Sequence, residues 1–223
     1  MAPYVADIRV GDPRIWRDDE ECKTWAAEGV RHAAGENPDL LAVIGRVKVQ
    51  RHQLGVLGSY THENDDLANA KWSFTLERPG HGAFADHFDN AYRALEEAQA
   101  SASRTGDNRN LLSNDEQGRA IRFVKPMFVD KRATGVEEHG DVLTWPVPRS
   151  SANRFSGMMM NMRFSPLQVF HESGFAVAPV DMATRLPGTL AEVTFSLHHT
   201  HWQHLDCDTF SALVSKVVML EDD

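Results

Sequence analysis

Residues 190–220 decide the fold class of this chain: LAEVTFSLHHTHWQHLDCDTFSALVSKVVML. Apolar and polar residues alternate from the start of this stretch, a period of two that is typical of a strand with one buried face. The apolar members are Val193, Phe195 and Leu197. We therefore predict two strands, Ala191–His199 and Thr209–Leu220, joined by a turn that carries histidines. The fold then closes on a β-hairpin.

Two helices are expected in the N-terminal half. Asp18–Ala34 begins at a residue that can cap the first turn, and Glu21 stands in the capping-box position. Ala83–Ala102 carries an apolar stripe at helical spacing and follows a Pro-Gly turn. Further strands are predicted by alternation or by short apolar runs at Leu40–Gln50, Leu54–Tyr60, Lys71–Glu77, Ile121–Val129 and Asp141–Val147.

These elements predict an α+β fold with a β-rich antiparallel sandwich or barrel-like core and about two helices in the N-terminal half. Strict alternation of strands and helices is absent, which disfavours a parallel doubly wound sheet. We expect residues 1–223 to form a single domain. Residues 101–118 are rich in Ser, Asn, Asp, Gly and Arg and are predicted to be a mobile loop.

The charge balance limits the classes of partner. The chain has 223 residues with 23 Lys and Arg against 32 Asp and Glu, a net charge of −9. This sign repels polyanions at long range and argues against nucleic acid as a partner, although an acidic body can still carry a basic groove. Two segments mix basic residues with groups that can stack on bases. They contain Arg46, Lys48, Gln50, Arg51 and His52, and Arg149, Asn153, Arg154 and Phe155.

Several common motifs are absent from the sequence. It contains neither GxxxxGK[ST] nor GxGxxG, and it lacks GxSxG and paired CxxC motifs. Nucleotide-driven motors, Rossmann dehydrogenases, hydrolases of the nucleophile-elbow type and structural zinc fingers are therefore disfavoured.

The expected compartment is cytoplasmic or nuclear. No signal peptide and no window of about 18 apolar residues is visible, so we expect a soluble chain with no membrane partner. Cys22 and Cys207 are far apart in sequence, which favours reduced thiols over a disulfide framework.

Histidine is the chemically versatile residue in visible excess, with 11 copies, four of them between residues 198 and 204. On an extended strand, His199 and His201 project to the same side, about 7 Å apart at their backbones. His204 can return after a turn, and Asp206 and Asp208 are close enough in sequence to complete a mixed nitrogen and oxygen site. The candidate metal ligands are His199, His201, His204 and Asp206, and the candidate cofactor is a divalent transition metal. The alternatives are a solvated turn and a contact that responds to pH.

The sequence shows no nucleophile–base set, nucleotide loop or pair of catalytic carboxylates, so we lean against an enzyme. Our main hypothesis is a soluble, intracellular, non-enzymatic binding or self-assembly protein, with a second copy or another protein as partner. One alternative is a metal-dependent enzyme, with non-haem iron or zinc, that uses the C-terminal histidine cluster. The other is a single-stranded nucleic-acid-binding protein.

Overall fold

The structure is a computed structural model. It describes residues 14–19, 22–27, 40–64, 66–80, 82–116, 118–131 and 144–221, the first two ranges by their backbone alone. No helix within these ranges is long and apolar enough to cross a membrane.

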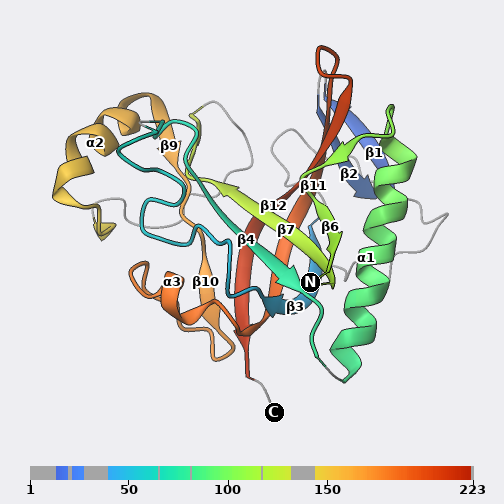
Figure 1. Cartoon of the computed structure of the whole chain (residues 1–223). Helices are drawn as coiled ribbons and strands as arrows, with labels where there is room; N and C mark the ends of the chain where they lie inside the picture. The colour runs from blue at the N-terminus through green and yellow to red at the C-terminus, as the bar shows by residue number, and fades with distance from the viewer. Residues whose placement is uncertain are drawn as a thin grey trace.

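Five strands close into a barrel, which forms the centre of the molecule (Figure 1). They are β3 (Leu41–Val47), β4 (Lys71–Glu77), β7 (Gly118–Pro126), β11 (Leu190–Trp202) and β12 (Cys207–Leu220). β3 pairs with β4 and β4 with β7 in antiparallel fashion, and β7 pairs with β12 in parallel. β12 then pairs with β11, and β11 returns to β3, both antiparallel. A five-stranded barrel of this connectivity has the architecture of the OB-fold, so the predicted β-rich α+β class with a barrel-like core is confirmed.

Alternating side chains of the five strands fill the barrel. Trp72, Phe74 and Leu76 of β4 are at most 1% exposed, as the alternation in this strand predicts. The ring of Phe123 in β7 stacks on Phe74 at 5.5 Å between centroids and meets Phe195 of β11 edge-on at 5.2 Å. Each fully buried side chain of this size contributes roughly 1.5–3 kcal/mol, so these rings are a main source of barrel stability.

The C-terminal hairpin is confirmed and is longer than predicted. β11 extends to Trp202 and β12 begins at Cys207, so the turn is confined to residues 203–206. Most of the clustered histidines therefore lie in the strand rather than in the turn. In the hairpin register, His201 stands opposite Asp208.

The first predicted helix is wrong wherever the structure describes it. In place of Asp18–Ala34 the chain forms an antiparallel hairpin of β1 (Arg14–Asp19) and β2 (Cys22–Ala27). β2 continues the sheet along the upper part of β11, where Thr24 stands opposite His198. Local capping signals stabilise a helix only weakly, whereas an unpaired strand edge offers a row of backbone hydrogen bonds. Residues 28–34 lie outside the described residues.

The second predicted helix is confirmed as α1 (Ala83–Ala102), which packs against the barrel beside β3. Phe88 of this helix is fully buried. A Cβ on Gly45 of β3 would lie 3.0 Å from the Phe88 ring, so glycine at this position allows the helix and the strand to approach closely.

The predicted strand Leu54–Tyr60 is not a strand. Residues 48–70, the β3–β4 loop, instead fold back on the barrel, and Gln53 makes an isolated antiparallel bridge with Ser73 of β4. Gly58 has a φ of +56°, and a Cβ there would lie 2.6 Å from the carbonyl oxygen of Lys71. A glycine is therefore required where the loop crosses β4.

A second, smaller body stands beside the barrel, and we call it the α2 lobe. It comprises the β3–β4 loop, β8 (Phe128–Asp130), a 3-10 turn (Arg149–Ser151), α2 (Ala152–Asn161) and β9 (Met162–Phe164). Its interior is aromatic: Phe164 lies 5.0 Å from Phe155 and 5.1 Å from Trp145 between ring centroids. The predicted strand Asp141–Val147 is absent over residues 144–147, and its start lies outside the described residues.

Four short elements complete the described chain. β5 (Asn108–Arg109) pairs with β12, β6 (Leu112–Asp115) with β7, and β10 (Val169–His171) with β12, while α3 (Met182–Arg185) precedes the hairpin. β5 and β6 fall within the predicted mobile loop at 101–118, whose mobility stays a prediction.

Candidate functional site

The histidine pair predicted to share one side of β11 does so, and both rings meet the carboxylate of Asp208. Nε2 of His199 lies 2.7 Å from Oδ1 of Asp208, and Nδ1 of His201 lies 3.2 Å from the same oxygen. His199 and Asp208 are buried, and the His199 ring stacks on Phe210 at 4.6 Å. The same-side placement predicted from the sequence holds, and of the two carboxylates considered, Asp208 is the one that both rings meet.

The second oxygen of Asp208 holds the segment that follows α1. It accepts hydrogen bonds from the backbone N–H groups of Arg104 at 2.9 Å and Thr105 at 2.7 Å. The hydroxyls of Thr105 and Ser103 also donate to it, at 2.9 and 3.2 Å. Burial raises the pKa of this carboxyl, but the hydrogen bonds from His199, Thr105 and Arg104 outweigh burial and hold the pKa well below its usual range. Asp208 thus stays charged and joins the hairpin to residues 103–105.

The other two predicted metal ligands lie in the hairpin turn. The ring of His204 meets Trp202 edge-on at 5.7 Å, and Asp206 adopts a positive φ of +46°. Within the part of the chain that the structure describes, no group of three or more His, Cys, Asp or Glu side chains is placed to hold a metal ion. A divalent metal at His199, His201, His204 and Asp206 stays a prediction.

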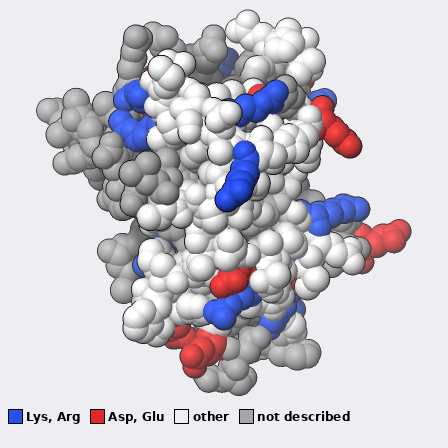
Figure 2. All heavy atoms as spheres, turned by 90° about the vertical axis from the view of Figure 1, so that its left-hand side faces the viewer, with Lys and Arg blue, Asp and Glu red and all other residues white. Residues whose placement is uncertain are grey.

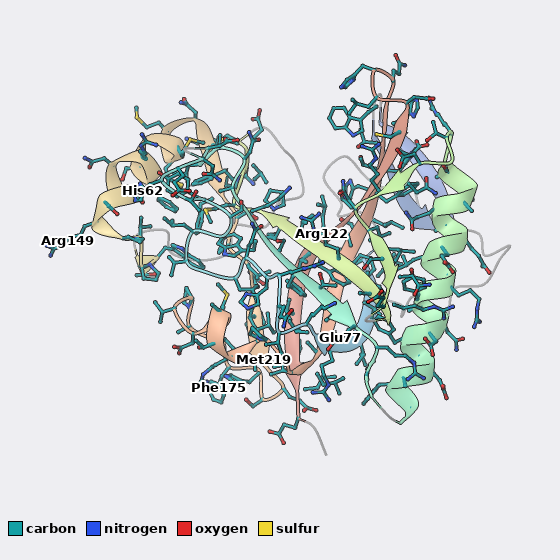
Figure 3. The ribbon with its side chains drawn as sticks, in the orientation of Figure 1. His62, Glu77, Arg122, Arg149, Phe175 and Met219 are labelled. Carbon is teal, nitrogen blue, oxygen red and sulfur yellow. The ribbon has the colours of Figure 1, made fainter. Side chains whose placement is uncertain are left out.

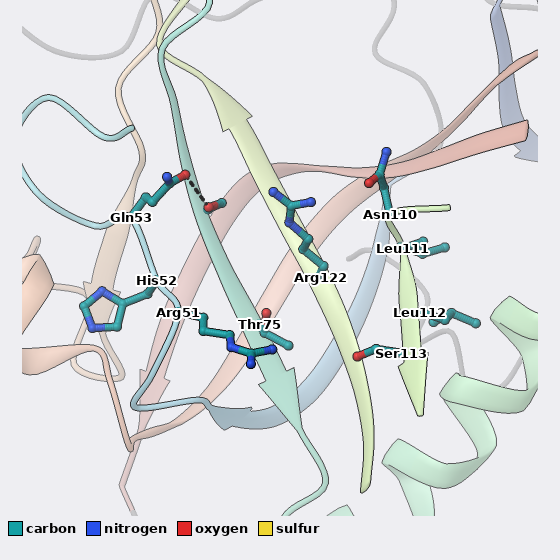
Figure 4. A pocket seen from close by; sticks show the side chains of 10 residues that line it. Arg51, His52, Gln53, Thr75, Asn110, Leu111, Leu112, Ser113 and Arg122 are labelled. Carbon is teal, nitrogen blue, oxygen red and sulfur yellow. Dashed lines mark hydrogen bonds between the residues drawn. The ribbon is translucent and has the colours of Figure 1, made fainter. Parts of the chain in front are cut away.

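A different site lies on the outer face of β4 and β7. It is a cavity of about 610 Å³, within the range of about 300–1,000 Å³ that is common for ligand pockets (Figure 4). Three segments contribute its walls: the start of the β3–β4 loop, the outward-facing residues of β4 and β7, and the chain around β6. The lining residues are Arg51, His52, Gln53, Ser73, Thr75, Asn110, Leu111, Leu112, Ser113 and Arg122.

Two arginines give this cavity its charge. Arg51 extends over β4 from the loop, and Arg122 rises from β7, where it stands opposite Thr75 (Figure 4). Neither guanidinium forms an ion pair or a side-chain hydrogen bond with another described residue, and none of the ten lining residues is acidic. Their hydrogen-bond donors therefore remain available to an anionic ligand.

A polar pair orients one further donor. The hydroxyl of Ser73 donates to Oε1 of Gln53 at 2.9 Å, and the two residues are also bridged through their backbones. With its oxygen engaged, the Gln53 amide presents its NH₂ group as the free end. The adjacent His52 has a buried Nδ1 atom with no hydrogen-bond partner among the described residues. The two guanidinium groups and the Gln53 amide are therefore donors that match the oxygens of phosphates and carbonyls.

Part of this site was visible in the sequence. Arg51 and His52 belong to the first of the two basic segments found in the sequence, but Arg46 of that segment donates instead to the carbonyl oxygen of Gly188 at 2.7 Å. Arg122 and Asn110 were missed, because they come from distant segments that only the barrel brings together. The alternation along β7 was the signal that could have placed Arg122 on an outer face.

Comparison with known proteins gives no match by sequence and several by structure. No protein-family model matches the chain, and no curated protein matches it in sequence. Among solved structures, the single-stranded DNA-binding protein gp2.5 of bacteriophage T7 has a TM-score of 0.47 and 12% identity, over 82% of this chain and 87% of that chain. The C-terminally truncated single-stranded DNA-binding protein from bacteriophage Enc34 has a TM-score of 0.45 and 9% identity, over 96% of this chain and 98% of that chain. The Enc34 protein in complex with ssDNA has a TM-score of 0.42 and 13% identity, over 93% of this chain and 94% of that chain.

These neighbours require a correction. From the net charge we argued against nucleic acid as a partner, and that expectation is contradicted by neighbours that are single-stranded DNA-binding proteins. A second copy or another protein as partner stays a prediction. The expectation failed because net charge is a property of the whole chain and does not describe a local site. A net charge of −9 sums over the whole chain, whereas Arg51 and Arg122 concentrate positive charge in one cavity that contains no carboxylate.

Proposed function

We propose that this protein binds single-stranded nucleic acid across the outer face of β4 and β7. The observation that carries the proposal is the cavity on this face, where Arg51 and Arg122 stand without a compensating carboxylate. Each guanidinium can donate two parallel hydrogen bonds to a phosphate. The second and third strands of OB-fold barrels are a common surface for oligonucleotides, and β4 and β7 are the second and third strands of this barrel.

The rest of the cavity suits unpaired bases better than a duplex. Guanidinium planes and the His52 imidazole can stack on the faces of bases, which are exposed only in a single strand. The Gln53 amide, held by Ser73, can donate to a base carbonyl. Four aromatic residues of the barrel strands are at most 1% exposed and are therefore unavailable for stacking: Trp72, Phe74, Phe195 and Phe210. Contacts to the backbone then dominate, with little dependence on base sequence.

The test is a binding titration of labelled oligonucleotides, single-stranded DNA, single-stranded RNA and duplex DNA, followed by fluorescence anisotropy at several salt concentrations. For a single strand, the logarithm of the affinity falls with the logarithm of salt by about 0.7 per neutralised phosphate. The double variant R51A/R122A should bind more weakly and lose about 1.4 from that slope. Arg93 of α1, an exposed arginine that is not among the residues lining the cavity, supplies the control R93A, which should leave the slope unchanged.

Two results would overturn the proposal. One is a wild-type protein that binds no single strand at low salt. The other is an R51A/R122A variant that remains folded and binds with the affinity and the salt slope of the wild type.

A further inference from the structure

The α2 lobe carries a second basic cluster that lies outside the cavity. Residues 144–164 contain three arginines and no acidic residue, on a chain whose net charge is −9. Figure 3 shows Arg149 pointing outward from this lobe and His62 beside α2, while Arg122 lies apart from both on the barrel. Figure 2 shows this side of the molecule, where Lys and Arg side chains are spread from the upper to the lower part and Asp and Glu lie mainly in the lower and right-hand parts.

The cluster is built from contacts between the β3–β4 loop and the start of α2. Nε2 of His62 lies 3.3 Å from the hydroxyl of Ser150, and Nη1 of Arg154 lies 3.4 Å from the hydroxyl of Tyr60. The rings of Tyr60 and His62 meet edge-on at 5.7 Å. His62, Ser150 and Arg154 are exposed, as is Arg149 directly before Ser150. One acidic residue, Glu63, directly follows His62 in the sequence.

The lobe holds this cluster at a fixed position relative to the cavity. Phe155 of α2 packs on Phe128 at 5.3 Å, and Trp145 packs on Trp72 of β4 at 5.7 Å. Nε1 of Trp145 also donates to the carbonyl oxygen of Val56 in the β3–β4 loop at 3.0 Å. The start of the same loop lines the cavity. The β3–β4 loop therefore contributes to both places, to the cavity through residues 51–53 and to the cluster through Tyr60 and His62.

We infer that Arg149, Arg154 and His62 form a second contact for the phosphate backbone of the same nucleic-acid strand, so that the bound segment extends from the barrel onto the α2 lobe. This inference rests on the proposed function. Exposed guanidinium groups match the phosphodiester chain, which carries one negative charge per nucleotide. A contact of this kind adds affinity only when the strand is long enough to occupy both sites.

The experiment measures affinity against oligonucleotide length for wild type, R149A/R154A and the control R93A, with oligothymidylates from about 6 to about 30 nucleotides. Short strands should bind wild type and R149A/R154A equally. With long strands, R149A/R154A should lose about 1.4 from the salt slope, as expected for two phosphate contacts to a single strand. Its affinity deficit should then be about sevenfold larger at 50 mM than at 200 mM salt. R149K/R154K retains the charge and should restore most of the affinity.

The outcomes separate this inference from the proposed function. Suppose that removing Arg122 weakens the binding of short and long strands, but R149A/R154A has the affinity of the wild type at every length. The second contact is then refuted, and the proposal that the cavity binds single strands is retained. If no strand binds at all, the proposed function fails. If R149A/R154A loses affinity for polyglutamate but not for long oligonucleotides, the cluster recognises acidic protein and the inference is overturned.

Discussion

Replacing Asp208 by asparagine tests the contact that joins the C-terminal hairpin to the segment after α1. The carboxylate is buried, with His199 and His201 on one oxygen and the backbone of Arg104 and Thr105 on the other. Asparagine has the same shape but no charge and only one accepting oxygen. That oxygen can keep the bonds to the backbone if the amide nitrogen turns toward the histidines.

The loss of stability in D208N follows from the hydrogen bonds that the substitution weakens. A hydrogen bond to a charged group contributes about 1.5–3 kcal/mol, against about 1 kcal/mol for a neutral one. If the bonds from Arg104 and Thr105 each weaken by about 1 kcal/mol, D208N lowers the free energy of unfolding by about 2 kcal/mol. For a chain of this size, that corresponds to a fall of about 4–8 °C in Tm. D208A leaves both buried N–H groups without an acceptor and should cost about 4–5 kcal/mol.

The pH dependence provides a second readout. The pKa of Asp208 in the folded protein lies below its usual range, so its stabilisation is complete above the unfolded pKa of about 3.9. It is lost as the pH falls through the folded pKa. The difference in stability between wild type and D208N should therefore be constant above about pH 5 and shrink as the pH is lowered through about 4 toward 3.

The assay is thermal and urea unfolding followed by tryptophan fluorescence at pH 7 and at pH 3.5. The matched control is D206N, because Asp206 lies in the turn at a positive φ that asparagine tolerates well. D206N should change Tm by less than about 2 °C. A D208N protein as stable as D206N at pH 7, or a deficit that does not shrink in acid, would refute the assignment of Asp208 as a charged structural contact.

The remaining predictions concern a lysine and the predicted metal site. Burial lowers the pKa of Lys125, so its ammonium group destabilises the fold below the folded pKa, and the penalty vanishes above the unfolded pKa of about 10.4. K125M should raise the free energy of unfolding by about 1 kcal/mol at pH 7, with a smaller gain near pH 10; urea unfolding that shows no gain at pH 7 would contradict this. For the metal, elemental analysis of untagged protein should show about one equivalent of a transition metal if His199, His201, His204 and Asp206 are ligands, and H204A should lose it. Less than about a tenth of an equivalent in the wild type would end that hypothesis.

Local patterns in the sequence were sufficient for several elements. The alternation from Lys71 to Glu77 and the apolar stripe of Ala83–Ala102 each predicted an element whose bounds the structure reproduces. In both cases one face of the element is buried and the other is polar, so the period of the side chains reports the backbone directly. The same logic placed His199 and His201 on one side of their strand.

Local patterns failed where a distant strand determined the outcome. The segment beginning at Asp18 has helix-capping residues, but its backbone pairs in β1 and β2, and β2 then pairs with β11. Local patterns also could not decide which of the two nearby carboxylates, Asp206 or Asp208, meets the histidines. The hairpin register, which depends on where the turn falls, places Asp208 opposite His201 and leaves Asp206 in the turn.

The sequence alone determined the β-rich class, the helix at α1, the C-terminal hairpin and the same-side placement of two histidines, because each depends on the periodicity of neighbouring residues. Tertiary structure decided the closure of the barrel and the cavity. Arg51 and Arg122 are 71 positions apart in the sequence, and they line one cavity only because β4 pairs with β7 while Gln53 bridges to Ser73. Net charge is a sum that contains no positions, so it could not reveal two cations that folding places together.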